Sequence, residues 1–146
     1  MKRRKGFTLI EVLIVIVVIA VLASIVIPRL LGAGRQAKEA SLRAHLQELR
    51  NSIGLFQSHT GTYPAALADI MGNAAPVSGL SVTAQVIPIN ASDYKGPYLT
   101  TADGNLPKNP ITSAIDWVYT VIAPSVGAVH APAGGALDGV TNYSEW

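Results

Sequence analysis

The chain has 146 residues, 49% of them hydrophobic and none of them cysteine, so a disulfide or a cysteine-ligated metal site is excluded. The net charge of +2 is misleading, because four of the eleven Lys and Arg residues lie at positions 2–5. From residue 7 onward, seven basic side chains face nine acidic ones. That balance, with no basic patch among aromatic residues, argues against a nucleic-acid-binding protein.

The first element expected along the chain is an apolar helix over residues 7–28. Only Thr8, Glu11 and Ser24 interrupt its hydrophobic run. About 20 helical residues span a hydrocarbon core of roughly 30 Å, and the basic residues before the run favour a cytoplasmic start. A secretory signal would be cut after its apolar region. Here the small residue, Gly6, precedes that region, so a cut there leaves the helix on the mature protein.

Glu11 stands out near the start of this apolar run. A lone charge in hydrocarbon costs about 3 kcal/mol even on lenient insertion scales. Either the carboxylate meets a positive partner there, or it lies near the headgroup layer and reaches water.

Beyond Pro28 the sequence keeps its helical character. Apolar residues recur at spacings of 4, 3, 4 and 3, which predicts one buried stripe along a helix: Leu42, Leu46, Leu49, Ile53 and Phe56. One nearly continuous helix is predicted from Phe7 to about Ser58, bent at Pro28, with Gly61 as its cap. The alternative is that Pro28 separates a membrane helix from an independent soluble helix.

The remaining sequence is rich in turn residues and carries short β-prone runs. Strands are predicted at 80–89, 117–123 and 126–131, the last two forming a hairpin. They would form a small antiparallel sheet. The predicted fold class is therefore α+β, with the stripe of the long helix covering the sheet.

The sequence "KGFTLIEVLIVIVVIAVLASIVIP" resembles the class III signal and helix of type IV pilins and type II secretion pseudopilins. The matching positions are Gly6, Phe7, Thr8, Leu9, Glu11 and Pro28. The resemblance implies that a prepilin peptidase cuts between Gly6 and Phe7 and N-methylates Phe7. It also implies four parts: a removed leader (1–6), a transmembrane and filament-core helix (7–28), its amphipathic half (29–60) and a β-rich head (61–146).

The family also implies a location and partners. The subunit would wait in the bacterial inner membrane as a single-pass protein, and an assembly platform with an ATPase would then add it to a homo-oligomeric helical filament. In that family Glu11 meets the Phe7 amine of a neighbouring subunit. Such pairing would fix the stagger between neighbours, because an offset would leave both ions unpaired.

Parts of the head resemble G-type major pseudopilins: "GTYPAALADI" (61–70), "GPYLTTADGNLPKNPI" (96–111) and "GGALDGVTNYSEW" (134–146). The resemblance implies a calcium-binding C-terminal loop, for which Asp138 is the weak candidate, although Asp138-Gly139 also fits a plain turn. No other cofactor is expected. His45, His59 and His130 belong to no catalytic motif and are expected to be structural.

The expected function is that of a structural filament subunit rather than an enzyme. A surface pilus is favoured, with the major pseudopilin of a type II secretion system as the alternative. A second class of protein also fits, a single-span envelope protein that binds a ligand without polymerising.

Overall fold

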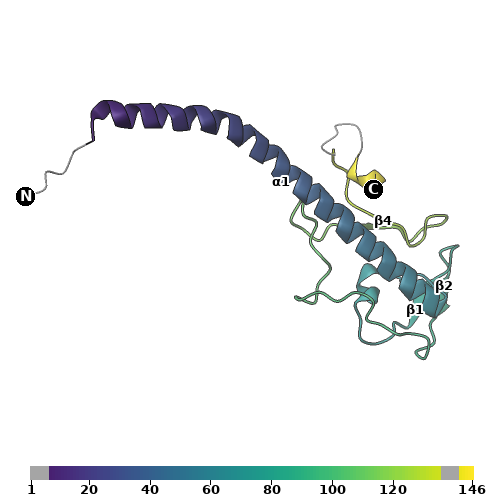
Figure 1. The fold of residues 1–146 in the computed structure, drawn as a ribbon. Helices are drawn as coiled ribbons and strands as arrows, with labels where there is room; N and C mark the ends of the chain where they lie inside the picture. Colours follow the sequence, from purple (N-terminus) through teal and green to yellow (C-terminus); the bar gives the residue numbers. More distant parts are fainter. Residues whose placement is uncertain (1–6, 136–141) are drawn as a thin grey trace, which may run out of the picture. The chain divides into compact units, whose positions relative to one another are not determined.

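The fold is described from a computed structural model, which describes residues 7–135 and 142–146. It divides into two compact units, Met1–Ala37 and Lys38–Trp146. One helix of 52 residues, α1 (Leu9–Thr60), contributes to both units (Figure 1). The helix continues through Pro28, although proline has no N–H to donate to the preceding turn. The continuous helix predicted from the sequence is confirmed.

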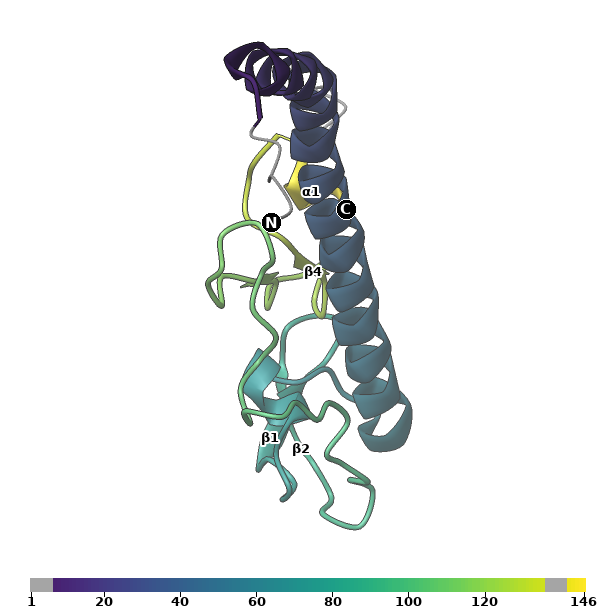
Figure 2. The same cartoon turned by 60° about the vertical axis from the view of Figure 1, so that its left-hand side comes forward.

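The predicted stripe is the centre of the head's core. Its five side chains are at most 3% exposed: Leu42, Leu46, Leu49, Ile53 and Phe56. Residues far along the chain complete the core: Leu67, Ile70, Leu99, Trp117, Val129, Ala131 and Tyr143. In Figure 2 the loops and strands of this unit lie on one side of the second half of α1. The amphipathic pattern therefore determines which side of the helix the head covers.

The end of α1 lies where the sequence predicts it. Gly61 has a φ of +72°, and its N–H donates to the carbonyl of Gln57 at 2.8 Å. This left-handed conformation satisfies an orphan carbonyl and is easily adopted by glycine. After Gly61 the chain leaves the helix and continues to the short 3₁₀ helix η1 (Leu67–Ile70).

The strands are shorter than predicted and form two sheets instead of one. β1 (Ser78–Leu80) pairs antiparallel with β2 (Val86–Pro88), and β3 (Val118–Tyr119) pairs antiparallel with β4 (Val129–His130). A second short 3₁₀ helix, η2 (Tyr143–Glu145), follows near the end of the chain. The predicted hairpin between 117–123 and 126–131 is confirmed as β3 and β4.

The single strand predicted at 80–89 is wrong, because the chain turns within it. The Ser81 hydroxyl accepts hydrogen bonds from the N–H groups of Thr83 and Gln85 at 3.2 and 3.0 Å, and Ala84 has a φ of 62°. Side-chain bonds of this kind offer the backbone an alternative to a strand ladder. The segment is therefore the turn that joins β1 to β2.

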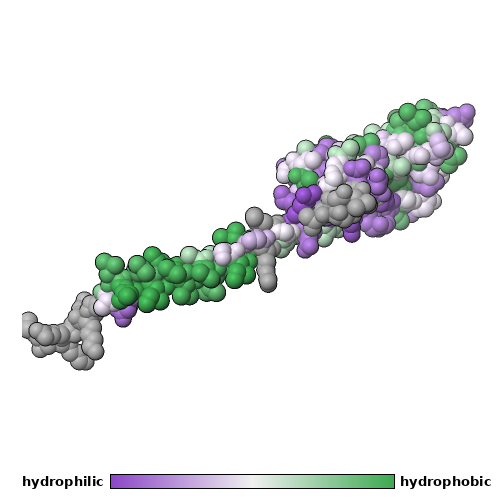
Figure 3. Space-filling model, turned by 90° about the horizontal axis from the view of Figure 1, so that it is seen from above, coloured by the Kyte–Doolittle hydropathy of each residue, from purple (hydrophilic) through white to green (hydrophobic). Residues whose placement is uncertain are grey.

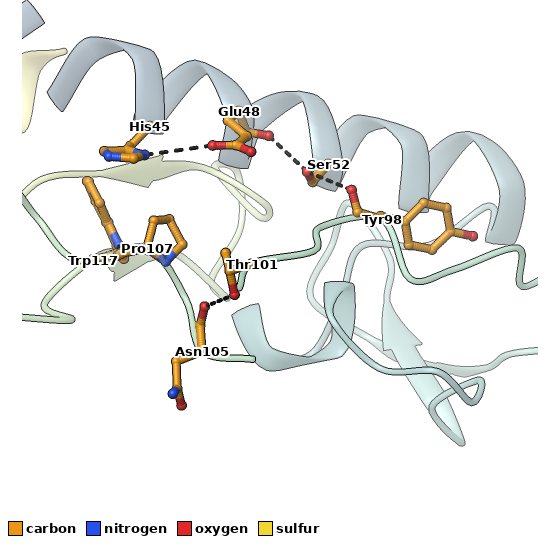
Figure 4. A network of polar contacts seen from close by, with 8 residues as sticks. All are labelled: His45, Glu48, Ser52, Tyr98, Thr101, Asn105, Pro107 and Trp117. Carbon is orange, nitrogen blue, oxygen red and sulfur yellow. Dashed lines mark hydrogen bonds and ion pairs between the residues drawn. The ribbon is translucent and has the colours of Figure 1, made fainter. Parts of the chain in front are cut away.

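Long loops account for most of the head, and hydrogen bonds attach them to the regular elements (Figure 4). The buried Ser52 hydroxyl donates to the carbonyl of Tyr98 at 3.1 Å. The Trp117 indole N–H donates to the carbonyl of Pro107 at 2.6 Å. The Tyr119 hydroxyl donates to the carbonyl of Pro64 at 2.6 Å. These bonds pair backbone carbonyls of the loops with side-chain donors on α1 and on or directly before β3.

Candidate assembly site

The first half of α1 is apolar and uncovered. Each large apolar side chain from Phe7 to Ile27 is between 49% and 87% exposed. By length and composition this part of the helix is able to cross a membrane. Figure 3 shows this apolar surface as a green stretch at the N-terminal half. An exposed apolar surface of this size requires another apolar environment to cover it.

Glu11 does not stand alone in this surface, because it caps its own helix. Its Oε2 accepts a hydrogen bond from the Thr8 N–H at 2.8 Å and another from the Thr8 hydroxyl at 2.8 Å. In return the Glu11 N–H donates to the Thr8 hydroxyl at 3.3 Å. This reciprocal arrangement is a capping box, which satisfies amide donors that the first helical turn leaves unpaired.

The capping box gives Thr8 a function that the sequence interpretation missed. The pattern Thr-x-x-Glu just before an apolar run is a known signature of a helix start, so the signal was present in the sequence. The box also keeps the carboxylate at the first turn, where the helix dipole stabilises negative charge. The predicted interaction of Glu11 with a neighbouring amine requires a second molecule and stays a prediction.

Glu11 also lines a hollow at the start of the helix. The hollow has a volume of 330 Å³ and is lined by Phe7, Glu11, Val12 and Val15. Its walls are almost wholly apolar side chains, with one carboxylate among them. A positively charged group entering this hollow would meet the carboxylate beside apolar side chains.

Other predicted site residues lie apart from this cluster or outside the described residues. Pro28 is inside α1, and Gly6 lies outside the described residues. Asp138, the calcium candidate, also lies outside them. Within residues 7–135 and 142–146, no group of three or more acidic, His or Cys side chains is placed to hold a metal ion.

The three histidines lie at separate places in the head. The His45 imidazole is 3.7 Å from the Glu48 carboxylate. The His59 Nδ1 is 3.2 Å from the Tyr98 hydroxyl, and the His130 Nδ1 is 2.9 Å from the carbonyl of Ala131. Each contact belongs to the packing of the head and involves no Ser or Cys nucleophile.

The shifted pKa values of Asp103 and Tyr119, in the head, have structural causes. The Asn105 N–H donates to the Asp103 carboxylate at 3.3 Å, and this bond lowers the pKa of Asp103. Burial raises the pKa of the Tyr119 hydroxyl, and the nearby Asp69 and Tyr63 raise it further. Local hydrogen bonding and burial within the loops of the head therefore account for both shifts.

Comparisons with known proteins agree with these features. Residues 1–27 match the model of the prokaryotic N-terminal methylation motif. The chain is 33% identical over 94 residues to the type IV wide pilus major component PilA4 of Thermus thermophilus. The aligned region covers 64% of this chain and 72% of that protein.

Similarity to secretion proteins is confined to a shorter stretch. The chain is 36% identical over 64 residues to the type II secretion system core protein G of Klebsiella pneumoniae, covering 44% of this chain and 46% of that protein. The corresponding protein of Vibrio cholerae is 34% identical over 64 residues, covering 44% of each chain. No solved structure matches the chain significantly. The methylation motif, the long helix with its exposed apolar half and the extended similarity to a pilus component together place this chain in the family of type IV pilins and type II secretion pseudopilins, which are structural subunits of pilus-like filaments.

Proposed function

We propose that the chain is a body subunit of a type IV pilus that polymerises through the first half of α1. The main evidence is the run of large apolar side chains from Phe7 to Ile27, each about half exposed or more. A lipid bilayer covers this surface before assembly, and the same segments of neighbouring subunits cover it in the filament. Both environments remove the apolar area from water, so transfer between them costs far less than exposure would.

Processing creates the subunit that assembles. A prepilin peptidase removes residues 1–6 by cutting between Gly6 and Phe7, and it methylates the new amino terminus. Residues 7–28 then form the membrane and filament-core segment, 29–60 the amphipathic half and 61–146 the head. The match of residues 1–27 to the methylation motif supports this order of events.

Glu11 determines how neighbours are aligned in the proposed filament. The Phe7 amine of one subunit enters the hollow that Glu11 lines on the next, and the two charges neutralise each other. A buried charge that loses its partner is strongly destabilising, so the wrong stagger is disfavoured at every subunit of the proposed filament. Pro28 lies at the end of this core segment, where the lost hydrogen bond allows the helix to adapt.

The extent of similarity favours a surface pilus over a secretion pseudopilus. Similarity to the wide pilus component covers 64% of the chain, whereas similarity to the core protein G of Klebsiella pneumoniae covers 44%. The pseudopilus is the second candidate, favoured by the Gly-Pro-Tyr-Leu segment at 96–99. The two differ in where the filament ends, outside the cell or in the periplasm.

The proposed role is structural and needs no catalytic group or cofactor in this chain. Its partners are copies of itself, the peptidase, and an inner-membrane platform driven by an ATPase. Calcium bound through Asp138 is a separate proposal. It predicts that a chelator reduces filament yield from cells and that Asp138→Asn reproduces the loss.

Mass spectrometry of the mature protein tests the proposal at its first step. The expected product begins at methylated Phe7, and Gly6→Asp should leave the leader attached. A product that keeps Met1, or one cut beyond Ala23, would instead support the non-polymerising envelope protein. Imaging cells with and without the gene then separates pilus from pseudopilus, because only the former gives surface filaments that deletion removes.

A further inference from the structure

A charged pocket lies on the head between α1 and the end of the chain. It has a volume of 290 Å³, and we name it the arginine pocket after its two guanidinium groups. Its lining residues are Arg43, Leu46, Gln47, Arg50 and Trp146. It belongs wholly to the unit Lys38–Trp146.

Internal contacts among the described residues hold both guanidinium groups in place and leave N–H groups of each unoccupied. The guanidinium carbon of Arg43 lies 4.1 Å from the ring centroid of Trp146, so the ring occupies one face and leaves the N–H edge open. Arg50 donates through Nη2 to the backbone carbonyl of Val129, at 3.1 Å, and to the main-chain oxygen of Trp146. Its other N–H groups have no acceptor among the described residues.

Neither arginine forms an ion pair with a side-chain carboxylate among the described residues. The Glu48 carboxylate, on the same helix, lies 3.7 Å from the His45 imidazole. Gln47 is also occupied, because its Nε2 donates to the Asn51 side chain at 2.9 Å. The arginine pocket therefore presents preorganised donors and positive charge, a combination that recognises a carboxylate through paired N–H bonds.

We propose that the arginine pocket receives the Asp93 carboxylate of a second copy of this chain, forming a contact between neighbouring heads. The inference rests on the proposed filament. A filament repeats a contact between two different patches of one surface, so a positive pocket needs a negative patch elsewhere on the same subunit.

Asp93 meets that requirement. It is exposed, and its carboxylate accepts a 3.3 Å bond from the Ser92 hydroxyl but has no cationic partner among the described residues. It follows β2, which lies near the end of α1 at Thr60, whereas the C-terminal residues lie beside earlier turns of that helix (Figure 1). Asp103, also exposed, differs because the Asn105 N–H already binds its carboxylate.

Charge reversal tests the pairing in cells. Arg43→Glu should reduce the yield of sheared filaments by about tenfold or more, since each subunit repeats the lost contact and gains a like-charge pair. The double variant Arg43→Glu/Asp93→Arg should restore the yield. Arg43→Glu/Asp103→Arg is the matched control and should not. Tryptophan fluorescence of the purified subunit checks that the head is folded in every variant.

Disulfide trapping gives an independent test, because the chain has no cysteine of its own. In Arg43→Cys/Asp93→Cys, oxidation of sheared filaments should give a ladder of covalent multimers, whereas either single variant should give at most dimers.

Wild-type yield in Arg43→Glu would overturn the inference. So would failed rescue by Asp93→Arg, rescue by Asp103→Arg, or filaments that form without a ladder. Failed rescue by both reversals would assign the pocket to another anion. If the wild-type chain forms no filaments at all, the proposed function fails instead, so the two failures are distinguishable.

Discussion

The two halves of α1 carry apolar side chains of similar kinds but differ in what covers them. In the second half, polar residues separate a stripe that loops and strands of the same chain bury completely, with Leu42 and Phe56 at 0% exposure. In the first half, apolar residues surround the helix and nothing in the described chain covers them. One helix thus supports an internal core at one end and, in the proposed filament, an intermolecular one at the other.

This difference indicates where each kind of mutation should act. Changes in the first half should spare the folded head and affect assembly, because their partners are in other molecules. Changes in the second half should destabilise the head before they affect anything else. Both Trp residues, Trp117 and Trp146, lie in the head, so the fluorescence of the full-length protein in detergent reports on that half alone.

The largest expected effect is that of Glu11→Val on assembly. The variant should insert in the membrane and lose its leader normally, yet sheared filaments should be absent, because the neighbour's amine is left without a counter-charge. Immunoblots of membrane and sheared fractions measure both steps. Leu13→Val in the same exposed surface is the control and should assemble. Normal filaments from Glu11→Val would show that the pairing of Glu11 with a neighbour's amine is not needed for assembly.

Phe56→Ala should act on the head alone. The ring is fully buried and packs edge-on against Tyr94 and Tyr98, with centroids 6.0 and 5.6 Å away. Its truncation should lower the free energy of unfolding by about 3–5 kcal/mol. Denaturant unfolding followed by tryptophan fluorescence measures the loss. Leu55→Ala, at an adjacent side chain that is 50% exposed, should cost much less, and equal losses would contradict the difference in burial.

Tyr119→Phe should cost about 1–2 kcal/mol, because the carbonyl of Pro64 loses its donor. Burial raises the pKa of Tyr119 above its unfolded value of about 10, so the neutral form is favoured on folding. The stability that it contributes is therefore complete below about pH 10 and is lost as the pH rises further. Melting temperatures between pH 8 and 11 should fall less steeply in the variant than in the wild type.

Tyr63→Phe provides a graded comparison for this alkaline effect. The Tyr63 hydroxyl is one of the groups that raise the pKa of Tyr119, after burial and Asp69. Its removal should therefore reduce the slope of stability against pH by less than Tyr119→Phe does. A steeper or equal slope in Tyr119→Phe would show that other groups determine the alkaline transition.

The smallest expected effect compares two glycines near the end of α1. Gly61→Ala should cost about 1 kcal/mol, since its φ of +72° is unfavourable for a residue with a Cβ even though space is open around it. Gly54→Ala, inside the helix with open space, should instead stabilise the head by about 0.5–1 kcal/mol. Chemical denaturation measures both, and a shared sign would contradict the difference in backbone conformation.

The helix and its buried stripe could be predicted because both depend on local periodicity. Leu42 to Phe56 recur at helical spacing, and a stripe of that kind must be buried whatever covers it. The capping box was equally available, since Thr8 and Glu11 have the characteristic separation. The methylation motif was recognisable for the same reason, because its signal lies in adjacent residues.

The rest of the head depends on contacts that no local pattern contains. Apolar residues at 80–89 favour a strand, but the Ser81 hydroxyl binds the turn amides and reverses the chain. Arg43 and Trp146 meet although they are 103 positions apart. The packing of the whole core determines which loop contacts which turn of the helix. The arginine pocket therefore could not be predicted from the sequence.

The capping box has a consequence for how tightly subunits are held together. Both Thr8 bonds end on the same oxygen of Glu11, Oε2, so they hold the carboxylate in place on the first turn while Oε1 can accept a neighbour's amine. In the proposed filament the acceptor is thus positioned before the neighbour arrives, and less conformational freedom is lost when two subunits join.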